Sequence, residues 1–288
     1  RRPLFVEKAN IFRYGREGRD ETDESLAPEK GDRQVLGSTV LWTSAQTDQP
    51  TAFPRCPWAL QFTEQTCQKA TVGEWNWEGD FRRHTIDEAE LIRDYFFRAI
   101  YGNWAFQKND WSQKERCAKL RLDWAGYVAG KRESRRLLGD LILTEQDVRQ
   151  QRQFPDACLV SPWHIDLHVA DPKNEAAFPE GAFRSLGSRT GGDVTTKPHL
   201  VPFRCLYSRN VANLMMAGRC ISVTHVAHGT IRVQRTGGMM GEVVGMAACL
   251  CAKHCTTPRG VYQNHLEELQ ELLRRGVGKE AEPAGVKR

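Results

Sequence analysis

This 288-residue sequence lacks a hydrophobic run long enough to cross a membrane. A transmembrane helix needs about 18 or more consecutive apolar residues, and the best candidate, Met239–Cys251, is shorter. The N-terminus also lacks a charged segment followed by an apolar one, which is the pattern of a secretory signal. We therefore expect a protein without membrane association.

Cysteine pairs at metal-binding spacing are absent as well. The nine cysteines are odd in number and no C-x-x-C pair occurs, which removes the signature of zinc ribbons and thioredoxin-like redox sites. Cys249, Cys251 and Cys255 share a predicted helix, where thiols usually act as small apolar side chains. We expect no metal site, and a reducing, cytoplasmic compartment is favoured.

A basic stripe of the kind that binds nucleic acid is also missing. The 41 basic and 36 acidic residues give a net charge of +5, but they are interspersed. The one dense basic cluster, Lys131–Arg136, is interrupted by Glu133. We expect no nucleic-acid partner, because the charge would have to gather on one face. A small positive excess suits an anionic cofactor or a small-molecule substrate, and nothing here indicates an oligomeric state.

Capping signals predict two helix starts. Thr85 and Glu88 form a capping box before an apolar repeat that runs to Ile100, and Thr144 and Asp147 form a second helix start. Further helices are expected over residues 112–122, 236–254 and 262–274. Extended segments are expected over 3–7, 35–44, 200–207, 214–217 and 231–233, and 171–192 is interpreted as a long loop.

The stretch 213–248 concentrates the residue types that carry chemistry. Its apolar strand is expected to end at Gly218-Arg219, and a loop with His225 and His228 follows. A buried strand brings such a loop to the carboxyl edge of a sheet, where the ligands of α/β folds bind. Imidazole titrates near neutrality, so either histidine suits a general acid or base, although a lone histidine is usually structural. Arg232 suits an anionic substrate group, or equally a salt bridge.

The helix that follows begins with Thr236-Gly237-Gly238. Small residues there let a flat ligand approach the backbone, whose free N–H groups and helix dipole favour negative charge. A flavin fits, because its N1–C2=O2 edge becomes negative on reduction. We expect Gly241 and Gly245, four residues apart, to let this helix pack tightly against a neighbour.

The same stretch resembles the closing motif of the FAD-dependent oxidoreductase family of bacterial flavoproteins. The resemblance continues upstream in the family's order, through segments 14–19, 24–30, 130–140, 142–144, 154–157, 163–168 and 201–207. His228-Gly229 and Arg232 are also distantly similar to the substrate end of succinate dehydrogenase and fumarate reductase flavoproteins, which carry His-Gly and Arg just before the flavin helix.

The resemblance implies FAD as cofactor and a hydride transfer to it from a small alcohol or amine. His225, His228 and Arg232 would be catalytic. The expected FAD contacts are Gly218, Arg219, Thr224, Thr236, Gly237, Gly238 and Met239. The expected substrate contacts are Arg132, Glu133, His164 and Arg204. His164, Asp166 and His168 would share one face of a strand, which we interpret as a polar substrate wall rather than a metal site.

The resemblance also implies an α/β fold, in which an α+β substrate-binding domain accompanies the C-terminal part of a Rossmann-like FAD-binding domain. We expect residues 1–40 as a remnant of the FAD-binding domain, 41–205 as the substrate-binding domain, 206–275 as the C-terminal FAD-binding part and 276–288 as a disordered tail.

One departure concerns the N-terminal βαβ unit of the family, whose G-x-G-x-x-G turn binds the FAD pyrophosphate. No such motif occurs here, and Lys8-Ala-Asn10 stands where the family has an acidic, Gly-rich turn. We therefore expect a fragment without the first unit. The alternative is a non-catalytic remnant, or a subunit that needs another chain to complete the FAD site. A third interpretation, binding or hydrolysis of carbohydrate, would use Trp75, Trp77, Glu74 and Asp80.

Overall fold

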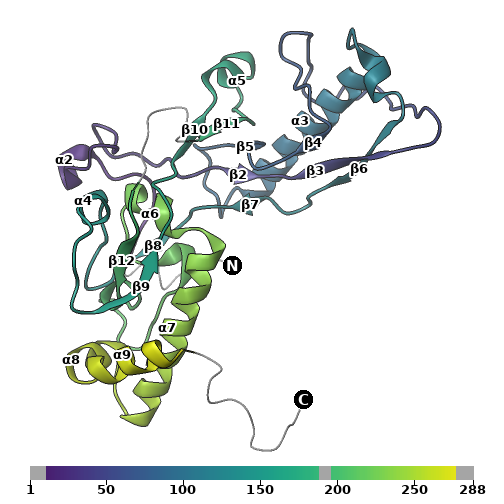
Figure 1. Cartoon of the computed structure of the whole chain (residues 1–288). Coiled ribbons are helices and arrows are strands. Elements are labelled where there is room, and N and C mark those ends of the chain that lie inside the picture. The colour runs from purple at the N-terminus through teal and green to yellow at the C-terminus, as the bar shows by residue number, and fades with distance from the viewer. Residues whose placement is uncertain (1–10, 188–195, 277–288) are drawn as a thin grey trace, which may run out of the picture. The chain divides into compact units, whose positions relative to one another are not determined.

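The computed structural model describes residues 11–187 and 196–276. The chain forms two compact units: unit 1 contains residues 1–33, 133–166 and 193–288, and unit 2 contains 34–132 and 167–192 (Figure 1). The range 41–205, expected as one domain, is therefore divided, because 133–166 and 193–205 belong to unit 1. The functional role expected for each segment stays a prediction.

Unit 2 is built from small antiparallel sheets and one long helix, α3 (Ala89–Asn109). The other elements are β2 (Ser38–Thr39), β3 (Trp42–Gln46), β4 (Val72–Gly73), β5 (Glu78–Gly79), a 3₁₀ helix (Lys114–Cys117), β6 (Leu120–Ala125), β7 (Gly130–Lys131), β10 (His168–Ala170), α5 (Pro172–Ala177) and β11 (Ser185–Gly187). The strand orders are β4-β3-β6, β5-β2-β7 and β10-β11.

Aromatic side chains fill the core of unit 2. The buried face of α3 brings Phe96 and Trp104 against the sheet residue Trp42 and its neighbour Trp77. The ring of Trp42 lies edge-on to both other tryptophans, with centroids 5.2 Å from Trp77 and 5.8 Å from Trp104. Trp77 is fully buried, so it is not the sugar-binding platform of the third interpretation.

Three sequence predictions in unit 2 were wrong in their details. The helix expected to start at Thr85 begins at Ala89, after a turn in which the Glu88 carboxylate accepts from the backbone N–H of His84 at 2.7 Å. The expected helix 112–122 is a short 3₁₀ helix followed by β6, because pairing with β3 outweighs the local helical pattern. The expected loop 171–192 contains α5, which Asp171 caps, and β11.

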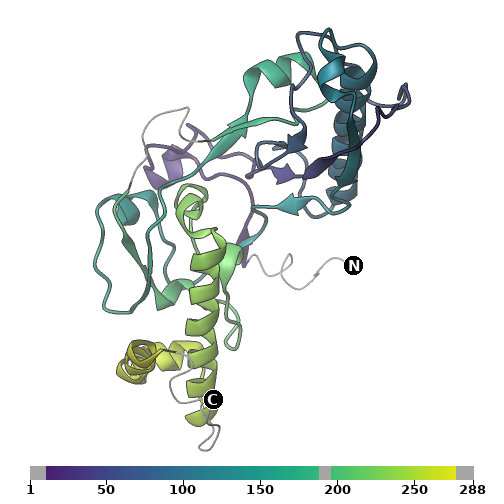
Figure 2. The ribbon, with the colours of Figure 1, turned by 45° about the vertical axis from the view of Figure 1, so that its right-hand side comes forward.

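Unit 1 is arranged around the long helix α7 (Gln234–Lys253), with α8 (Pro258–Asn264) and α9 (Leu266–Arg275) beside its C-terminal end in both views (Figures 1 and 2). Its other elements are β1 (Phe12–Arg13), α2 (Arg19–Thr22), β8 (Arg136–Leu137), α4 (Glu145–Arg149), β9 (Ala157–Ser161), β12 (His199–Pro202), two 3₁₀ helices (Phe203–Cys205 and Gly218–Cys220) and α6 (His225–Ile231). Strand β1 pairs with β8, and β9 with β12, both antiparallel.

The structure confirms the second helix start. The Thr144 hydroxyl accepts from the backbone N–H of Asp147, the Asp147 carboxylate accepts from that of Thr144, and α4 follows. The strand expected over 200–207 is β12, which ends at Pro202, because proline has no N–H to continue the ladder.

The strand expected over 214–217 was wrong, since only Met215 makes an isolated bridge, to Tyr207. In the piece expected over 231–233 only Val233 is extended, because Ile231 closes α6 and Arg232, its C-cap, keeps a helical conformation. Helix α7 begins at Gln234, two residues earlier than expected, and the last helix is divided at His265 into α8 and α9. The expectations for 3–7 and for the tail beyond 276 lie outside the described residues.

The described residues therefore form a mixed fold of helices and small sheets, which is consistent with the α/β class. Every ladder between the strands named above is antiparallel, and the isolated bridge Leu143–Val223 is parallel. The Rossmann-like sheet and the missing N-terminal βαβ unit stay predictions. Among the described residues, no helix is both long and apolar enough to pass through a bilayer.

Candidate functional site

Helix α6 carries both candidate histidines and is held at its N-terminus by acidic side chains from far away in the sequence. The Thr224 hydroxyl accepts from the backbone N–H of Ala227 at 3.2 Å and donates to Glu24 at 2.6 Å. The Glu17 carboxylate accepts from the backbone N–H of His225 at 2.8 Å. A carboxylate there satisfies a free helix donor and complements the helix dipole. The expected loop is thus a buried, capped helix.

Glu133 links His225 to Arg136. One carboxylate oxygen lies 2.8 Å from Nδ1 of His225, and the other lies 2.9 Å from Nε of Arg136. Arg136 is itself buried and donates to both oxygens of Glu17, at 3.0 and 3.1 Å, and to the carbonyl of Val223 at 2.9 Å. The buried charges are therefore paired with one another, as burial requires.

The protonation of this cluster follows from its charges. Burial alone would raise the pKa of the Glu133 carboxyl, but His225 and Arg136 beside it bring the pKa well below its ordinary value. Glu133 is thus a carboxylate, which accepts the proton on Nδ1 of His225.

His228 lies one turn further along α6 and differs from His225. Its side chain is fully buried, and neither ring nitrogen has a hydrogen-bond partner in the described part of the chain. Burial lowers the pKa of His228 to about 3; the Glu133 carboxylate opposes this shift, while Arg136 and Arg232 add to it. His228 is therefore a neutral imidazole at physiological pH.

Arg232 follows α6 and holds the segment beside it. Its guanidinium donates to the carboxylate of Asp166 at 2.7 Å and to the carbonyl of the same residue at 3.1 Å. Gly229 makes this approach possible, because a Cβ there would lie 3.0 Å from the backbone nitrogen of Asp166. The structure thus gives Arg232 a carboxylate partner, which the salt-bridge interpretation had anticipated.

The expected flavin contacts Gly218 and Thr236–Met239 lie at and just after the first turn of α7. Because α7 begins at Gln234, the Gly237 N–H, which the sequence predicted to be free, donates to the carbonyl of Val233 at 3.0 Å. Gly218 has a φ of +80° and donates its N–H to the sulfur of Met240 at 3.2 Å. A Cβ added at Gly237 would lie 3.6 Å from the Cα of Gly218, and one added at Gly238 would meet no atom within 4 Å. The Thr236 hydroxyl is buried without a hydrogen-bond partner among the described residues. This open, glycine-lined turn fits the flat edge of a flavin.

The remaining FAD candidates lie near this turn in different settings. Arg219 is exposed on the 3₁₀ helix that starts at Gly218, and Met239 is partly buried on α7. The expectation that Gly241 and Gly245 pack against a neighbour was wrong for the described residues, because a Cβ at either position would meet no atom within 4 Å. Helix α7 turns its buried side chains, such as Val243, to the opposite face.

Two of the expected substrate contacts have partners within their own units. In unit 2, Arg132 donates to the carbonyl of Trp75 at 2.9 Å and lies 3.1 Å from the Glu78 carboxylate. In unit 1, Arg204 binds Asp156 through two side-chain hydrogen bonds, at 2.8 and 2.9 Å. A purely structural role of Arg132 and Arg204 also explains these contacts.

The expected strand that carries His164, Asp166 and His168 on one face was wrong. Only His168 lies in a strand, β10, where its ring binds Glu78. His164 instead stacks on Trp163, with ring centroids 5.0 Å apart, and its Nε2 is 4.0 Å from the Asp166 carboxylate. Asp166 is bound by Arg232, so the three side chains have different partners and do not form the expected shared polar face.

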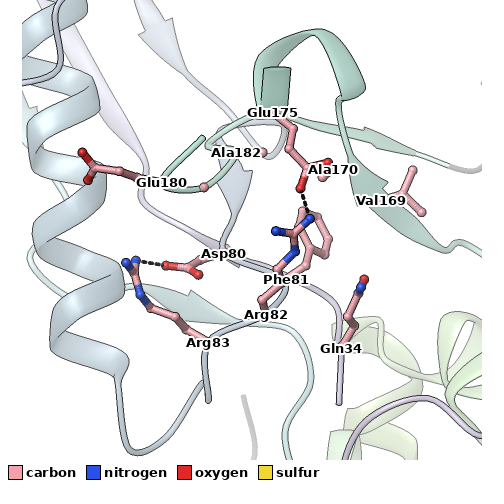
Figure 3. A pocket seen from close by; sticks show the side chains of 11 residues that line it. Gln34, Asp80, Phe81, Arg82, Arg83, Val169, Ala170, Glu175, Glu180 and Ala182 are labelled. Atoms are coloured by element: carbon pink, nitrogen blue, oxygen red, sulfur yellow. Dashed lines mark hydrogen bonds and ion pairs between the residues drawn. The ribbon is translucent and has the colours of Figure 1, made fainter. Parts of the chain in front are cut away.

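Two cavities have walls within a single unit. In unit 2, a cavity of about 270 Å³ is lined by charged side chains that pair with each other: Arg83 with Asp80 and Arg82 with Glu175, each at 2.5 Å (Figure 3). In unit 1, a larger cavity of about 700 Å³ is lined by residues 12–17 and 30–33, among others. Glu17 belongs to its wall and also contacts Arg136 and the start of α6.

Sequence reasoning missed three members of the buried cluster: Glu17, Glu24 and Arg136. All three lie in segments quoted for the family resemblance, but neither their burial nor their partners is visible in the local pattern. Glu17 and Arg136 are 119 residues apart, and Glu24 and Thr224 are 200 residues apart. Their presence in the resembling segments was the one signal that could have found them.

Comparison with known proteins gives one match. No curated protein and no solved structure shows significant similarity to the chain. The model of one family, described as FAD dependent oxidoreductase, matches residues 11–273, which is most of the chain. The protein thus belongs to the FAD dependent oxidoreductase family, and FAD is the cofactor that this family implies.

Proposed function

We propose that this chain oxidises a small organic molecule, an alcohol or an amine, at an FAD whose ring lies against the first turn of α7. The observation that carries the proposal is the Glu133–His225 pair, 2.8 Å apart, at the head of a buried helix. FAD, when bound, supplies the acceptor for the hydride of the substrate. Gly218 and Thr236–Met239 would hold its ring.

His225 is the better base of the two histidines. The carboxylate of Glu133 fixes the proton on Nδ1, so that the lone pair on Nε2 is directed to the reacting group. His228 lacks such a partner, and its lowered pKa makes it a weak proton acceptor. We propose that His228 lines the site as an uncharged side chain and takes no part in proton transfer.

The cavity of unit 1 is our candidate for the substrate entrance. Its wall includes Glu17, which caps the helix that starts with His225. Arg33 and Arg209 also line it, and they would favour a substrate with a negative group. Arg232 orients the site from the other end of α6, through Asp166.

The test is the rate at which a substrate reduces FAD bound to the chain. Purified protein loaded with FAD is mixed anaerobically with a panel of alcohols and amines, and flavin bleaching is followed. We expect His225→Gln to slow bleaching about 100-fold or more, which is the usual contribution of a general base. His84→Gln, which changes a histidine of unit 2, is the control and should leave the rate unchanged.

Equal rates for His225→Gln and the wild-type chain would contradict the assignment of the base. The alternative of a remnant, or of a subunit completed by another chain, is favoured by one observation: the sequence has no G-x-G-x-x-G turn for the pyrophosphate. Failure of the purified chain to retain FAD on desalting would support that alternative.

A further inference from the structure

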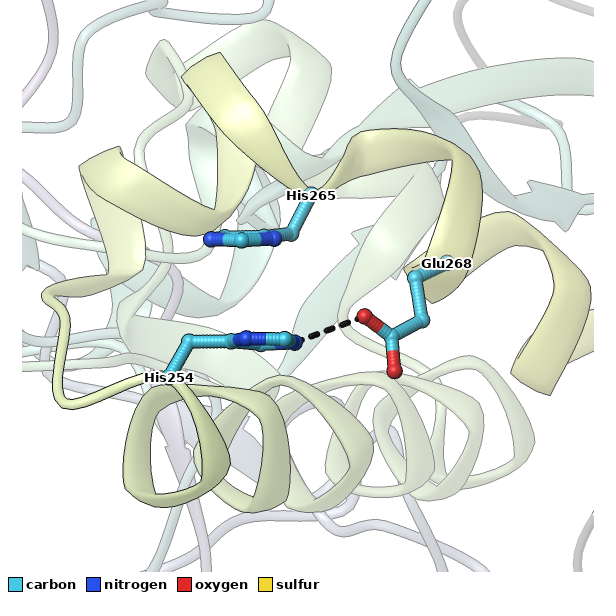
Figure 4. Close-up of side chains that lie close together, drawn as sticks. All are labelled: His254, His265 and Glu268. Carbon is cyan, nitrogen blue, oxygen red and sulfur yellow. Dashed lines mark hydrogen bonds and ion pairs between the residues drawn. The ribbon is translucent and has the colours of Figure 1, made fainter.

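Two histidines and a glutamate meet where α7 ends and α9 begins, in unit 1. His254 is the C-cap of α7, and His265 is the N-cap of α9. Glu268 lies in the first turn of α9. The intervening helix α8 folds the chain back, so that His254 becomes a neighbour of His265 and of Glu268, which lies 14 positions further along the chain (Figure 4).

The side chains of this trio lie close together, with the His254 ring directed at Glu268 and the His265 ring stacked on that of His254 (Figure 4). The two imidazole rings are stacked, with centroids 3.8 Å apart and planes inclined by 8°. Nε2 of His254 lies 2.7 Å from one oxygen of Glu268, and the potential ligand atoms of all three side chains lie within 4.8 Å of one another. Figure 4 shows the carboxylate beside the edge of the His254 ring.

Glu268 does not make the capping hydrogen bond that is common for a glutamate in the first turn of a helix. A glutamate in the first turn commonly reaches back to the backbone N–H of the N-cap residue. Here one oxygen instead meets His254, and the other lies 2.6 Å from Nζ of Lys253. No side-chain hydrogen bond caps α9. The carboxylate is thus directed at the imidazoles, and no hydrogen bond to the His265 ring is formed within the described residues.

We propose that His254, His265 and Glu268 bind a Zn²⁺ ion that joins the end of α7 to the start of α9. Two imidazoles and one carboxylate are a donor set that zinc accepts, with water as a fourth ligand. Ligands at about 2.0–2.1 Å from a tetrahedral ion lie about 3.4 Å apart. Because the two rings are stacked nearly parallel, one of them must turn out of the stack so that both nitrogen lone pairs are directed at the ion. All three residues are partly exposed, which lets the ion and the water enter.

The competing account is a stacked histidine pair held by one ion pair, without metal. It explains the contact of His254 with Glu268 but gives the ring of His265 no polar partner. The two accounts differ in what Zn²⁺ does. An ion that binds the folded chain better than the unfolded chain raises the melting temperature, whereas the ion pair is indifferent to added zinc.

The experiment measures Zn²⁺ binding to the full chain by calorimetry, and the melting temperature with and without Zn²⁺. We expect one ion per chain and a higher melting temperature. Glu268→Gln should weaken binding at least about tenfold, since the charged ligand is lost. Glu271→Gln, which changes a partly exposed glutamate on the same helix, is the matched control and should bind as the wild-type chain does. His265→Ala should weaken binding as Glu268→Gln does.

Co²⁺ serves as a spectroscopic probe of the ligands. Nitrogen and oxygen ligands give visible bands without a strong sulfur-to-metal charge-transfer band, and we expect this spectrum. A charge-transfer band would show that cysteines bind the ion and would overturn the proposal. Equal Zn²⁺ affinity in Glu268→Gln, Glu271→Gln and the wild-type chain, or no Zn²⁺ binding by the wild-type chain, would overturn it as well.

Discussion

The burial of His228 predicts how the stability of the protein depends on pH. Burial lowers its pKa from 6.5 to about 3, so between these values the unfolded chain binds a proton that the folded chain does not. Its contribution to the free energy of unfolding is therefore complete above pH 6.5 and is lost as the pH falls toward 3.

The corresponding prediction compares His228→Asn with the wild-type chain in urea unfolding at neutral pH and near pH 5. The wild-type chain should lose on the order of 2 kcal/mol more than the variant over this range, because each pKa unit is worth about 1.4 kcal/mol. Acidic residues contribute to both curves, so the difference between the curves isolates the imidazole. Parallel curves for the two proteins would show that His228 is not buried as described.

Residue types in the site could be predicted from the sequence, but their partners could not. His225, His228 and Arg232 stood out because titratable groups gather in one short stretch. Glu17 and Arg136 could not be placed there, since a pairing over 119 residues leaves no local pattern. The sequence left His225 and His228 as equal candidates for the base, and the position of Glu133 and the lowered pKa of buried His228 distinguish them.

Among the elements, α6 shows how tertiary contacts override local propensity. Its sequence contains Gly229 and the β-branched Val226, Thr230 and Ile231, which disfavour a helix. The helix forms because Thr224 and Glu17 satisfy its first N–H groups and because all its residues are buried. By contrast, α4 could be predicted, since its capping box lies within four consecutive residues.

Removing the cap of α6 should therefore affect the whole unit. Thr224→Val keeps the shape of the side chain but loses the bonds to Ala227 and Glu24. We expect the free energy of unfolding to fall by about 1–2 kcal/mol, the usual range for losing an N-cap. Thr224→Ser retains the hydroxyl and should stay within about 0.5 kcal/mol of the wild-type chain. Urea unfolding curves that do not distinguish the two variants would contradict this role of Thr224.

The division of the whole molecule could not be predicted from the order of its segments. Unit 1 draws on three separate parts of the chain, and its middle part, 133–166, stands between the two parts of unit 2 in the sequence. The segment that contains Glu133 and Arg136 contacts the rest of unit 1 through buried ion pairs with His225 and Glu17. These pairs are not visible in the sequence. The family resemblance identified the segments of the chain, and the structure shows which of them belong to the same unit.

The central claim is that a flavin lies against the first turn of α7. Gly238→Leu fills the space beside that turn, whereas Gly245→Leu makes the same change two turns further along the helix. Neither new Cβ meets an atom within 4 Å, so both variants should fold, and each gains up to about 1 kcal/mol from better helix propensity.

The decisive measurement is FAD binding to the purified chains, followed by the shift of the flavin visible spectrum and by retention on desalting. We predict that the wild-type chain and Gly245→Leu retain FAD and that Gly238→Leu does not. Retention of FAD by Gly238→Leu as tight as by the wild-type chain would place the flavin elsewhere and contradict the account.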